Sequence, residues 1–259
     1  MLSSLFTYKE LIIRLAKTDF LLRYQNSWLG YIWALLKPLL FFLVLNFVFS
    51  SIFNFKNMGT PFYTLELLTA FLMFNFFAEG TSSGMSALLS KGQLVTKIAL
   101  PRWTLVVSST LHSLLVFITN LVVVVGFFIY YGKMPSVGGI IFFLGSIILL
   151  YIFILACSFI LAPLFVRFRD VSMIWEVLVS ILMYASPIVY PLVMLPEYLH
   201  RWLLVSPLAF IIHFSKQGLI SDLFAQTHHV IIMVLACIGF LVLSILLFKK
   251  TSRRIAEYI

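Results

Sequence analysis

The chain has 259 residues, of which 62% are hydrophobic and only 10% carry a charge, and its mean hydropathy is +1.09. A soluble domain of this length cannot hide so much apolar surface, so the composition excludes a soluble protein and predicts an integral membrane protein. The formal net charge of +9 then reflects topology and contact with anionic lipids rather than binding to nucleic acid.

The N-terminal region, residues 1–28, predicts a basic amphipathic helix that lies at the membrane interface. On a helix, Leu15 and Leu22 share an apolar face, whereas Arg14 lies on the opposite, charged face. Two interpretations stay open: an anchor in the inner leaflet, or an anchor that also contacts a cytoplasmic partner. Asp19 falls on the apolar face and fits neither interpretation.

Six stretches further along are long and apolar enough to cross a bilayer as helices, which takes about 20 residues each. They are continuous apolar runs, whereas the strands of a membrane barrel alternate polar and apolar side chains over about ten residues. The sequence therefore predicts an all-α membrane protein with six transmembrane helices. The predicted spans are residues 29–53, 65–85, 103–131, 137–166, 171–189 and 230–248.

The distribution of positive charge predicts the orientation of these spans. With both termini in the cytoplasm, 14 of the 18 lysines and arginines fall on the cytoplasmic side, as the positive-inside rule requires. An apolar segment before the last span is too short to cross and is interrupted by prolines, so it predicts short re-entrant helices on the external side. The chain is then one transmembrane domain, 1–259, made of an interface helix (1–28), spans one to five (29–189), an external segment (190–229), the sixth span (230–248) and a cytoplasmic tail (249–259).

The chain shows no pattern of an enzyme. It has no G-x-x-x-x-G-K-[ST] phosphate loop, no H-E-x-x-H metal motif and no G-x-S-x-G elbow. Its two cysteines, Cys157 and Cys237, both fall inside predicted spans, where their spacing supports neither a disulfide framework nor a metal site. We expect no catalysis, no metal and no cofactor in this chain, so that any nucleotide energy comes from another subunit.

Four short segments, in the order in which they occur, resemble a known family of membrane proteins. RYQNSWLGYIWALLKP (23–38) opens the first span, and SKGQLVTKIALPR (90–102) connects the second and third spans. FRD (168–170) precedes the fifth span and SPIVYP (186–191) follows its apolar core. Together they resemble the ABC-2 type polysaccharide export permeases, the membrane subunits of O-antigen, capsule and teichoic acid exporters.

The resemblance implies a permease subunit in the bacterial cytoplasmic (inner) membrane that exports a lipid-linked glycan. Six spans make only half the wall of a wide conduit, so a second copy of the chain is implied, as closed twofold assembly is the usual solution. Two copies of a separate ABC ATPase, which bind ATP and Mg²⁺, would drive export. Two alternatives stay open: an ABC-2 permease for small drugs or lipids, and an ATP-independent secondary carrier.

The connection between the second and third spans is the candidate contact with the ATPase. It carries three cations, and the resemblance implies a coupling helix docked in a groove of the ATPase, so that nucleotide-driven closure tilts the spans. The plain alternative is a connector that only obeys the positive-inside rule. The candidate coupling residues are Ser90, Lys91, Gly92, Leu94 and Lys97.

Aromatic side chains gather near the two ends of the predicted membrane domain. Sugar rings can stack their apolar C–H faces on aromatic rings, so substrate contact is one interpretation, and anchoring at the membrane interface is the other. Lys37, inside the first span, either snorkels to the interface or receives the phosphate of the substrate. The candidate channel or substrate-contact residues are Trp28, Tyr31, Trp33, Lys37, Tyr184 and Tyr190.

The proline-rich region after the fifth span is the candidate external gate. In the resembling family this region closes the external mouth of the channel, whereas the plain alternative is a structural cap buried against the protein. The candidate gate residues are Pro187, Pro191, Pro196 and Trp202.

Besides Lys37, three glutamates and one histidine fall within predicted spans: Glu66, Glu79, His112 and Glu176. A proton-coupled carrier would gather such groups around one midplane site. In the sequence they fall at different depths, so we expect them to form hydrogen bonds inside the bundle rather than a proton relay.

Overall fold

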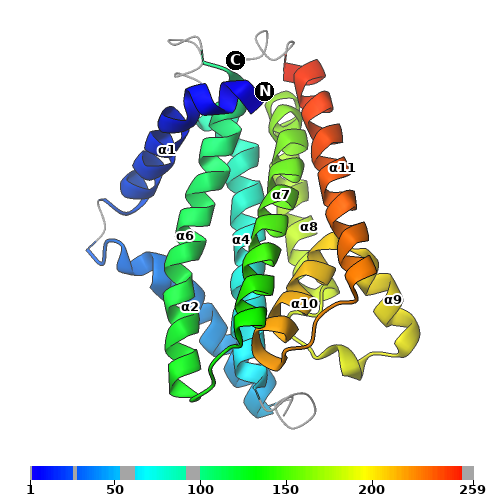
Figure 1. The fold of residues 1–259 in the computed structure, drawn as a ribbon. Helices are drawn as coiled ribbons and strands as arrows, with labels where there is room; N and C mark the ends of the chain where they lie inside the picture. The colour runs from blue at the N-terminus through cyan, green and yellow to red at the C-terminus, as the bar shows by residue number, and fades with distance from the viewer. Residues whose placement is uncertain (1, 26–27, 53–61, 92–99, 253–259) are drawn as a thin grey trace.

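The computed structural model describes residues 2–25, 28–52, 62–91 and 100–252, and these residues contain helices but no strand (Figure 1). The prediction of an all-α membrane protein is therefore confirmed for the part of the chain that the structure describes. The helices are α1 (Leu2–Tyr24), α2 (Ile32–Asn46) continued by a π-helical turn (Phe47–Ile52), α4 (Tyr63–Ser90), α6 (Arg102–Tyr130), α7 (Val137–Arg167), α8 (Val171–Ala185), a 3₁₀ turn (Leu192–Met194), α9 (Glu197–Val205), α10 (Pro207–Ser221) and α11 (Thr227–Ser252).

Four helices among the described residues are long and apolar enough to cross a membrane by themselves: Ile32–Ser50, Arg102–Tyr130, Val137–Arg167 and Thr227–Ser252. They coincide with the first, third, fourth and sixth predicted spans. The chain is an integral membrane protein. The second and fifth predicted spans are not among these four helices, and their helices differ from the predicted ones.

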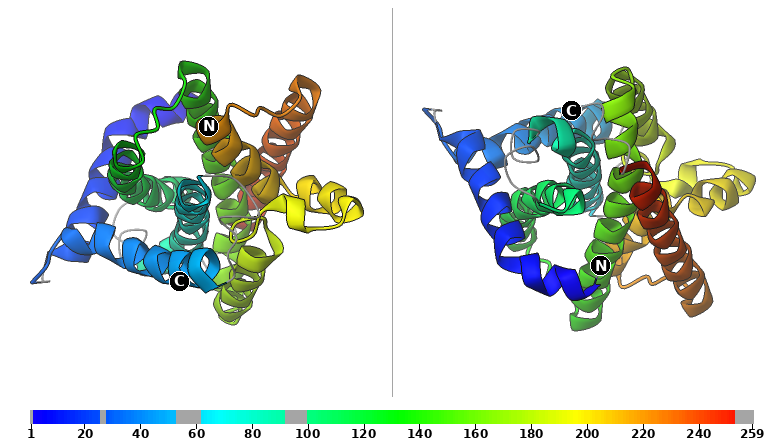
Figure 2. Two further views of the ribbon diagram at one scale, coloured as in Figure 1. Left: turned by 90° about the horizontal axis from the view of Figure 1, so that it is seen from below. Right: turned by 90° about the horizontal axis from the view of Figure 1, so that it is seen from above.

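The second predicted span is the 28-residue helix α4, which is less apolar than the four candidates because it lies inside the bundle. It contacts α2, α6, α7, α8 and α10, and Figure 2 shows it between α6 and α7. Polar side chains such as Thr69 and Thr81 are buried there. A helix enclosed by protein can carry polar groups that a lipid-facing helix cannot, because neighbouring helices supply hydrogen bonds.

Two glycines allow α4 to approach α7 closely. A Cβ atom on Gly84 would lie 2.5 Å from the Cβ of Ser158, and one on Gly80 would lie 2.8 Å from the Cγ2 of Ile154. The spacing of four residues places both glycines on one face of α4, which is how small residues bring membrane helices together. The sequence analysis overlooked this pair.

The fifth predicted span ends earlier than expected. Its helix, α8, stops at Ala185 rather than 189, because Ser186 adopts an extended backbone (φ −103°, ψ 149°) and a residue before proline avoids the helical conformation. Fifteen residues reach only about 22 Å as a helix, less than the hydrocarbon thickness of about 30 Å.

The segment before the last helix contains two helices that meet at a sharp bend. Tyr198–Val205 and Pro207–Ser221 are inclined at 106°, and together they have the length and apolarity of one broken span or of a re-entrant pair. Pro207 occupies the first position of α10, where proline starts a helix without losing a hydrogen bond.

Several helix ends gather at one end of the molecule (Figure 1). The Tyr8 ring of α1 meets the Trp103 ring of α6 edge-on at 6.3 Å. The Arg102 guanidinium donates to the carbonyl of Ser252, so the start of α6 contacts the end of α11. The first and last described helices therefore meet the bundle at the same end.

Candidate functional site

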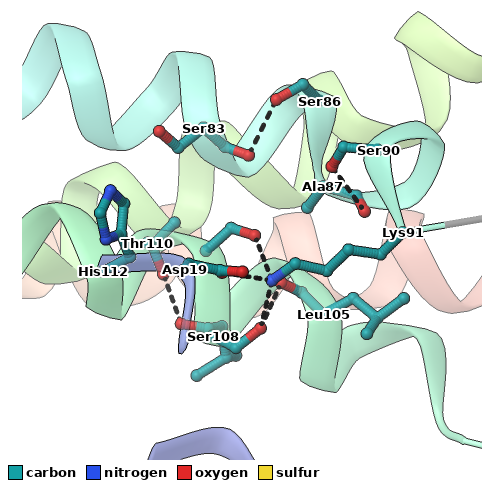
Figure 3. A network of polar contacts seen from close by, with 12 residues as sticks. Asp19, Ser83, Ser86, Ala87, Ser90, Lys91, Leu105, Ser108, Thr110 and His112 are labelled. Carbon is teal, nitrogen blue, oxygen red and sulfur yellow. Dashed lines mark hydrogen bonds and ion pairs between the residues drawn. The ribbon is translucent and has the colours of Figure 1, made fainter. Parts of the chain in front are cut away.

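A largely buried lysine of the predicted coupling segment joins three helices (Figure 3). Lys91 directly follows the last residue of α4, and its ammonium group lies 2.5 Å from a carboxylate oxygen of Asp19 on α1. The same ammonium donates to the hydroxyls of Ser108 and Ser109 on α6, each at 3.1 Å. The Lys91 side chain is only 11% exposed and that of Asp19 26%. A charge-assisted network of this kind is stronger than neutral hydrogen bonds and fixes the helices relative to one another.

The network explains why an acidic residue stands on the apolar face of α1. That face packs on the bundle through Ile12 and Ala16, which are buried, and Asp19 continues it toward Lys91. Leu22, predicted on the same face, is instead exposed, because the inward face passes through Asp19 and Arg23 near the end of the helix. The apolar face of α1 therefore packs against the helix bundle of the same chain over most of its length.

A second polar cluster lies one turn further along α1. The Arg23 guanidinium forms an ion pair with Glu79 of α4 and lies 3.3 Å from Nε2 of His112 on α6. Phe20 stacks on Tyr31 at 5.7 Å and also approaches His112. Glu79 and His112, which fall at different depths in the sequence, are therefore joined by an arginine from outside both spans, and these polar contacts agree with the hydrogen bonding expected of them.

The predicted coupling residues are only partly placed. The Ser90 hydroxyl donates to the carbonyl of Ala87, 3.4 Å away within α4, and Lys91 points into the network rather than toward a surface. Gly92, Leu94 and Lys97 lie outside the described residues.

The aromatic candidates at the start of the first span are exposed on this chain. Trp28 is 98% exposed, and Tyr31 and Trp33 are 48% and 40% exposed. Lys37 is also exposed, on the first turns of α2. Because Tyr31 stacks on Phe20 of α1, it has a structural contact, whereas Trp28 keeps its whole ring available.

The helix α8 presents an exposed apolar face with one acid in it. Met173, Val177 and Ile181 are each more than half exposed, and Glu176 is exposed among them. In Figure 2, α8 and α2 lie on the same side of the bundle. Within the described part of the chain, neither Glu176 nor Lys37 takes part in an ion pair.

The candidate gate residues divide into a buried and an exposed pair. Pro187 and Pro191 are buried, whereas Pro196 and Trp202 are exposed, Trp202 by 77%. The buried pair belongs to a segment, residues 186–191, that packs into the core through Ile188 and Val189.

The two tyrosine candidates at this end contact each other. The Tyr190 hydroxyl donates to the carbonyl of Tyr184, 3.1 Å away. Burial raises the pKa of Tyr190 above its ordinary value, so this hydroxyl keeps its proton at physiological pH and remains a donor. Tyr184 itself is 61% exposed on α8.

Sequence analysis missed two residues that hold segment 186–191. The Lys216 ammonium of α10 donates to the carbonyl of Pro187 at 2.8 Å, and the Tyr63 hydroxyl of α4 donates to that of Val189. The signal in the sequence is a lysine within a largely apolar segment.

Comparison with known proteins agrees with this helical membrane architecture. Residues 10–220 match the ABC-2 type transporter family. The chain is 26% identical over 252 residues to an O-antigen export system permease protein RfbA of Klebsiella pneumoniae, covering 96% of this chain and 94% of the relative. It is 29% identical over 188 residues to RfbA of Myxococcus xanthus, covering 73% of this chain and 71% of the relative. The resemblance seen in the four motifs is thereby confirmed, and the chain belongs to the ABC-2 type transporter family.

Proposed function

We propose that this protein is the permease subunit of an ATP-driven exporter that moves a lipid-linked polysaccharide, O-antigen-like or a related cell-surface glycan, across the bacterial cytoplasmic membrane. The observation that carries the proposal is similarity along nearly the whole chain to O-antigen export permeases. Membership of the ABC-2 type transporter family favours an ATP-driven exporter over an ATP-independent carrier. A separate ATPase, in two copies, would bind ATP and Mg²⁺ and hydrolyse the nucleotide.

The arrangement of helix ends supports six spans with both termini in the cytoplasm. The end of the bundle that holds Lys91, Arg102 and Arg167 also holds the end of α11, with Lys249 and Lys250. Positive charge at this end suits the cytoplasmic side. In this topology α8 completes the fifth crossing with its connecting segment, and α9 and α10 form a re-entrant pair on the external side.

A homodimer is supported by the face that carries α2 and α8. Its exposed charges, Lys37 and Glu176, are costly against lipid and suit a water-filled channel or a second copy. Two copies related by a twofold axis would place both faces around one conduit. The exposed aromatic rings of Trp28, Trp33 and Tyr184 would then be available to the sugar rings of the passing chain.

The coupling segment follows the Lys91 network directly, which supports a role in transmitting motion from the ATPase. A push on the segment that begins at Ser90 would reach α4, and through Lys91 also α1 and α6. Packed helices move as units of this kind when a docked partner closes.

The test is to purify the tagged chain from native membranes in mild detergent and to identify the proteins that co-elute. We expect an equimolar ATPase with a G-x-x-x-x-G-K-[ST] loop, and we expect deletion of the gene to trap lipid-linked glycan on the cytoplasmic side. Co-elution of the ATPase with normal glycan export after deletion would favour drugs or small lipids as cargo. A stable assembly without any ATPase would contradict the proposal altogether.

A further inference from the structure

Two side chains from two helices donate hydrogen bonds to the backbone of residues 186–191 at the external end. Lys216, 3% exposed on α10, donates to the carbonyl of Pro187, and Tyr63, the first residue of α4, donates to the carbonyl of Val189. Between these carbonyls lies Ile188, which is completely buried. We call Lys216 and Tyr63 the carbonyl clamp.

A buried lysine at this position calls for an explanation, because removing an ammonium group from water costs free energy. Replacing a buried charge by an apolar side chain of similar size is often neutral or stabilising, so packing alone does not require it. What lysine supplies and methionine cannot is a charge-assisted hydrogen bond to the Pro187 carbonyl. Burial lowers the pKa of Lys216, and the charge of the buried Glu66 on α4 opposes this effect and favours the ammonium form.

The clamped segment has few backbone hydrogen bonds of its own. Pro187 and Pro191 have no N–H group to donate, and the described contacts within the segment include the bond from the Ile188 N–H to the carbonyl of Ser186 at 2.7 Å. Its position therefore depends on donors from outside. The two donors come from helices far away in the sequence and attach the segment to the bundle, whereas the Ser186 N–H and the Tyr190 hydroxyl attach it to the end of α8.

The segment also connects two elements with different surroundings. Before it lies α8, whose side chains are largely exposed, and after it lie the 3₁₀ turn and α9. α10 itself is largely buried against α4 and α7. A displacement of α8 away from the bundle would pull on residues 186–191, and the carbonyl clamp would resist it.

We infer that Lys216 and Tyr63 are the positioning residues of the external gate: by holding the carbonyls of Pro187 and Val189 they keep the segment after α8 across the mouth of the conduit until transport displaces it. The inference rests on the proposed export function in treating this region as a gate. Beyond that function, it identifies Lys216 and Tyr63 as the residues whose hydrogen bonds stabilise the closed position of the gate.

The first experiment measures amide hydrogen exchange of the wild-type chain in lipid nanodiscs, in a peptide covering residues 183–195. Lys216→Met removes the charge-assisted bond and keeps the side-chain volume, so exchange should rise on the order of tenfold. Tyr63→Phe removes one oxygen and should raise it about fivefold. Lys250→Met and Tyr131→Phe are the controls, because they remove the same groups at positions away from residues 186–191 and should leave this peptide unchanged.

The second experiment measures leakage of a small fluorescent sugar through the full exporter in sealed vesicles without ATP. Both clamp variants should leak more than wild type, and the double variant should leak less than the product of the single effects, because both bonds hold one segment. Tyr63→Phe guards against misfolding of the lysine variant, since it changes no charge and no packing volume. Exchange or leakage at the level of the controls in both variants would overturn the inference.

The two proposals fail in different ways. If wild-type cells export no glycan through this protein, the proposed function is wrong, yet the exchange experiment still shows whether the clamp fixes residues 186–191. If wild-type cells export glycan and the clamp variants exchange faster without leaking, the clamp holds the segment but not the gate, and the inference alone is wrong.

Discussion

Asp19 and Lys91, which are 72 residues apart in the sequence, form an ion pair of 2.5 Å between the N-terminal helix and the end of α4. The contact attaches α1 to the bundle at Lys91, within the predicted coupling segment. The N-terminal helix is therefore an integral part of the membrane domain and not only an anchor in the lipid. We expect a motion that starts in the coupling segment to be shared with α1.

Neutralising Asp19 should loosen this attachment. In Asp19→Asn the mostly buried Lys91 ammonium loses its counter-ion and keeps only hydroxyl partners, so the free energy of unfolding should fall by about 2 kcal/mol. Thermal unfolding in detergent measures the change, and faster proteolysis within α1 locates it. Glu10→Gln is the matched control: it removes the exposed pair with Arg14 and should cost less than about 0.5 kcal/mol. Equal effects of the two variants would show that the buried pair does not hold α1.

Adding a single methyl group to Gly84 should separate α4 from α7. In Gly84→Ala the new Cβ would lie 2.5 Å from the Cβ of Ser158, so the helices must move apart at a cost of about 1 to 3 kcal/mol. The control is Gly239→Ala on α11, where a Cβ meets no atom within 4 Å. The control should unfold at or above the wild-type temperature, since alanine favours a helix over glycine. A Gly84→Ala protein as stable as this control would refute the close packing.

Removing the Trp28 ring should reduce export more than it reduces protein abundance. The ring is almost completely exposed, so Trp28→Ala removes little packing, whereas loss of a stacking surface for sugar should slow glycan export on the order of fivefold. Tyr190→Ala should act in the same direction at the external end. Export per molecule of membrane-inserted protein is the measurement, with Tyr130→Ala as the control. Export that falls only in step with abundance would mean that these rings are structural.

Replacing residues 92–97 by a polar linker of equal length should disconnect the permease from its ATPase. Membrane insertion should persist, because no span is altered, while co-purification of the ATPase weakens and export stops. The Lys91→Met variant tests the neighbouring link to α1 separately and should keep ATPase binding. Normal export by the linker variant would contradict a coupling role for the segment.

The exposed face of α8 should be close to a second copy of the chain. A cysteine introduced at Ile181 should give dimers with a short thiol cross-linker in membranes, while one at Leu243, an exposed position of α11, should not. The native Cys157 and Cys237 are buried and should remain unreacted. Cross-linking at Leu243 but not at Ile181 would place the contact between copies on a different face.

The membrane class, the helical fold, the family and the approximate bounds of four spans follow from the sequence alone. Hydrophobic runs report burial in lipid directly, because lipid tolerates few exposed polar groups. The four motifs likewise depend only on residues that are near one another in the chain. This is also why the sequence identifies α1 as amphipathic without showing what its apolar face contacts.

The tertiary structure alone decides which polar groups meet. Asp19 with Lys91, Arg23 with Glu79 and His112, and Lys216 with the carbonyl of Pro187 all join residues from separate segments of the chain. Neither periodicity nor hydropathy relates residues so far apart, since the pairing depends on how each helix is rotated and how closely it packs. The enclosure of α4 likewise follows from helix packing, which lets a less apolar helix stand at the centre of a membrane protein.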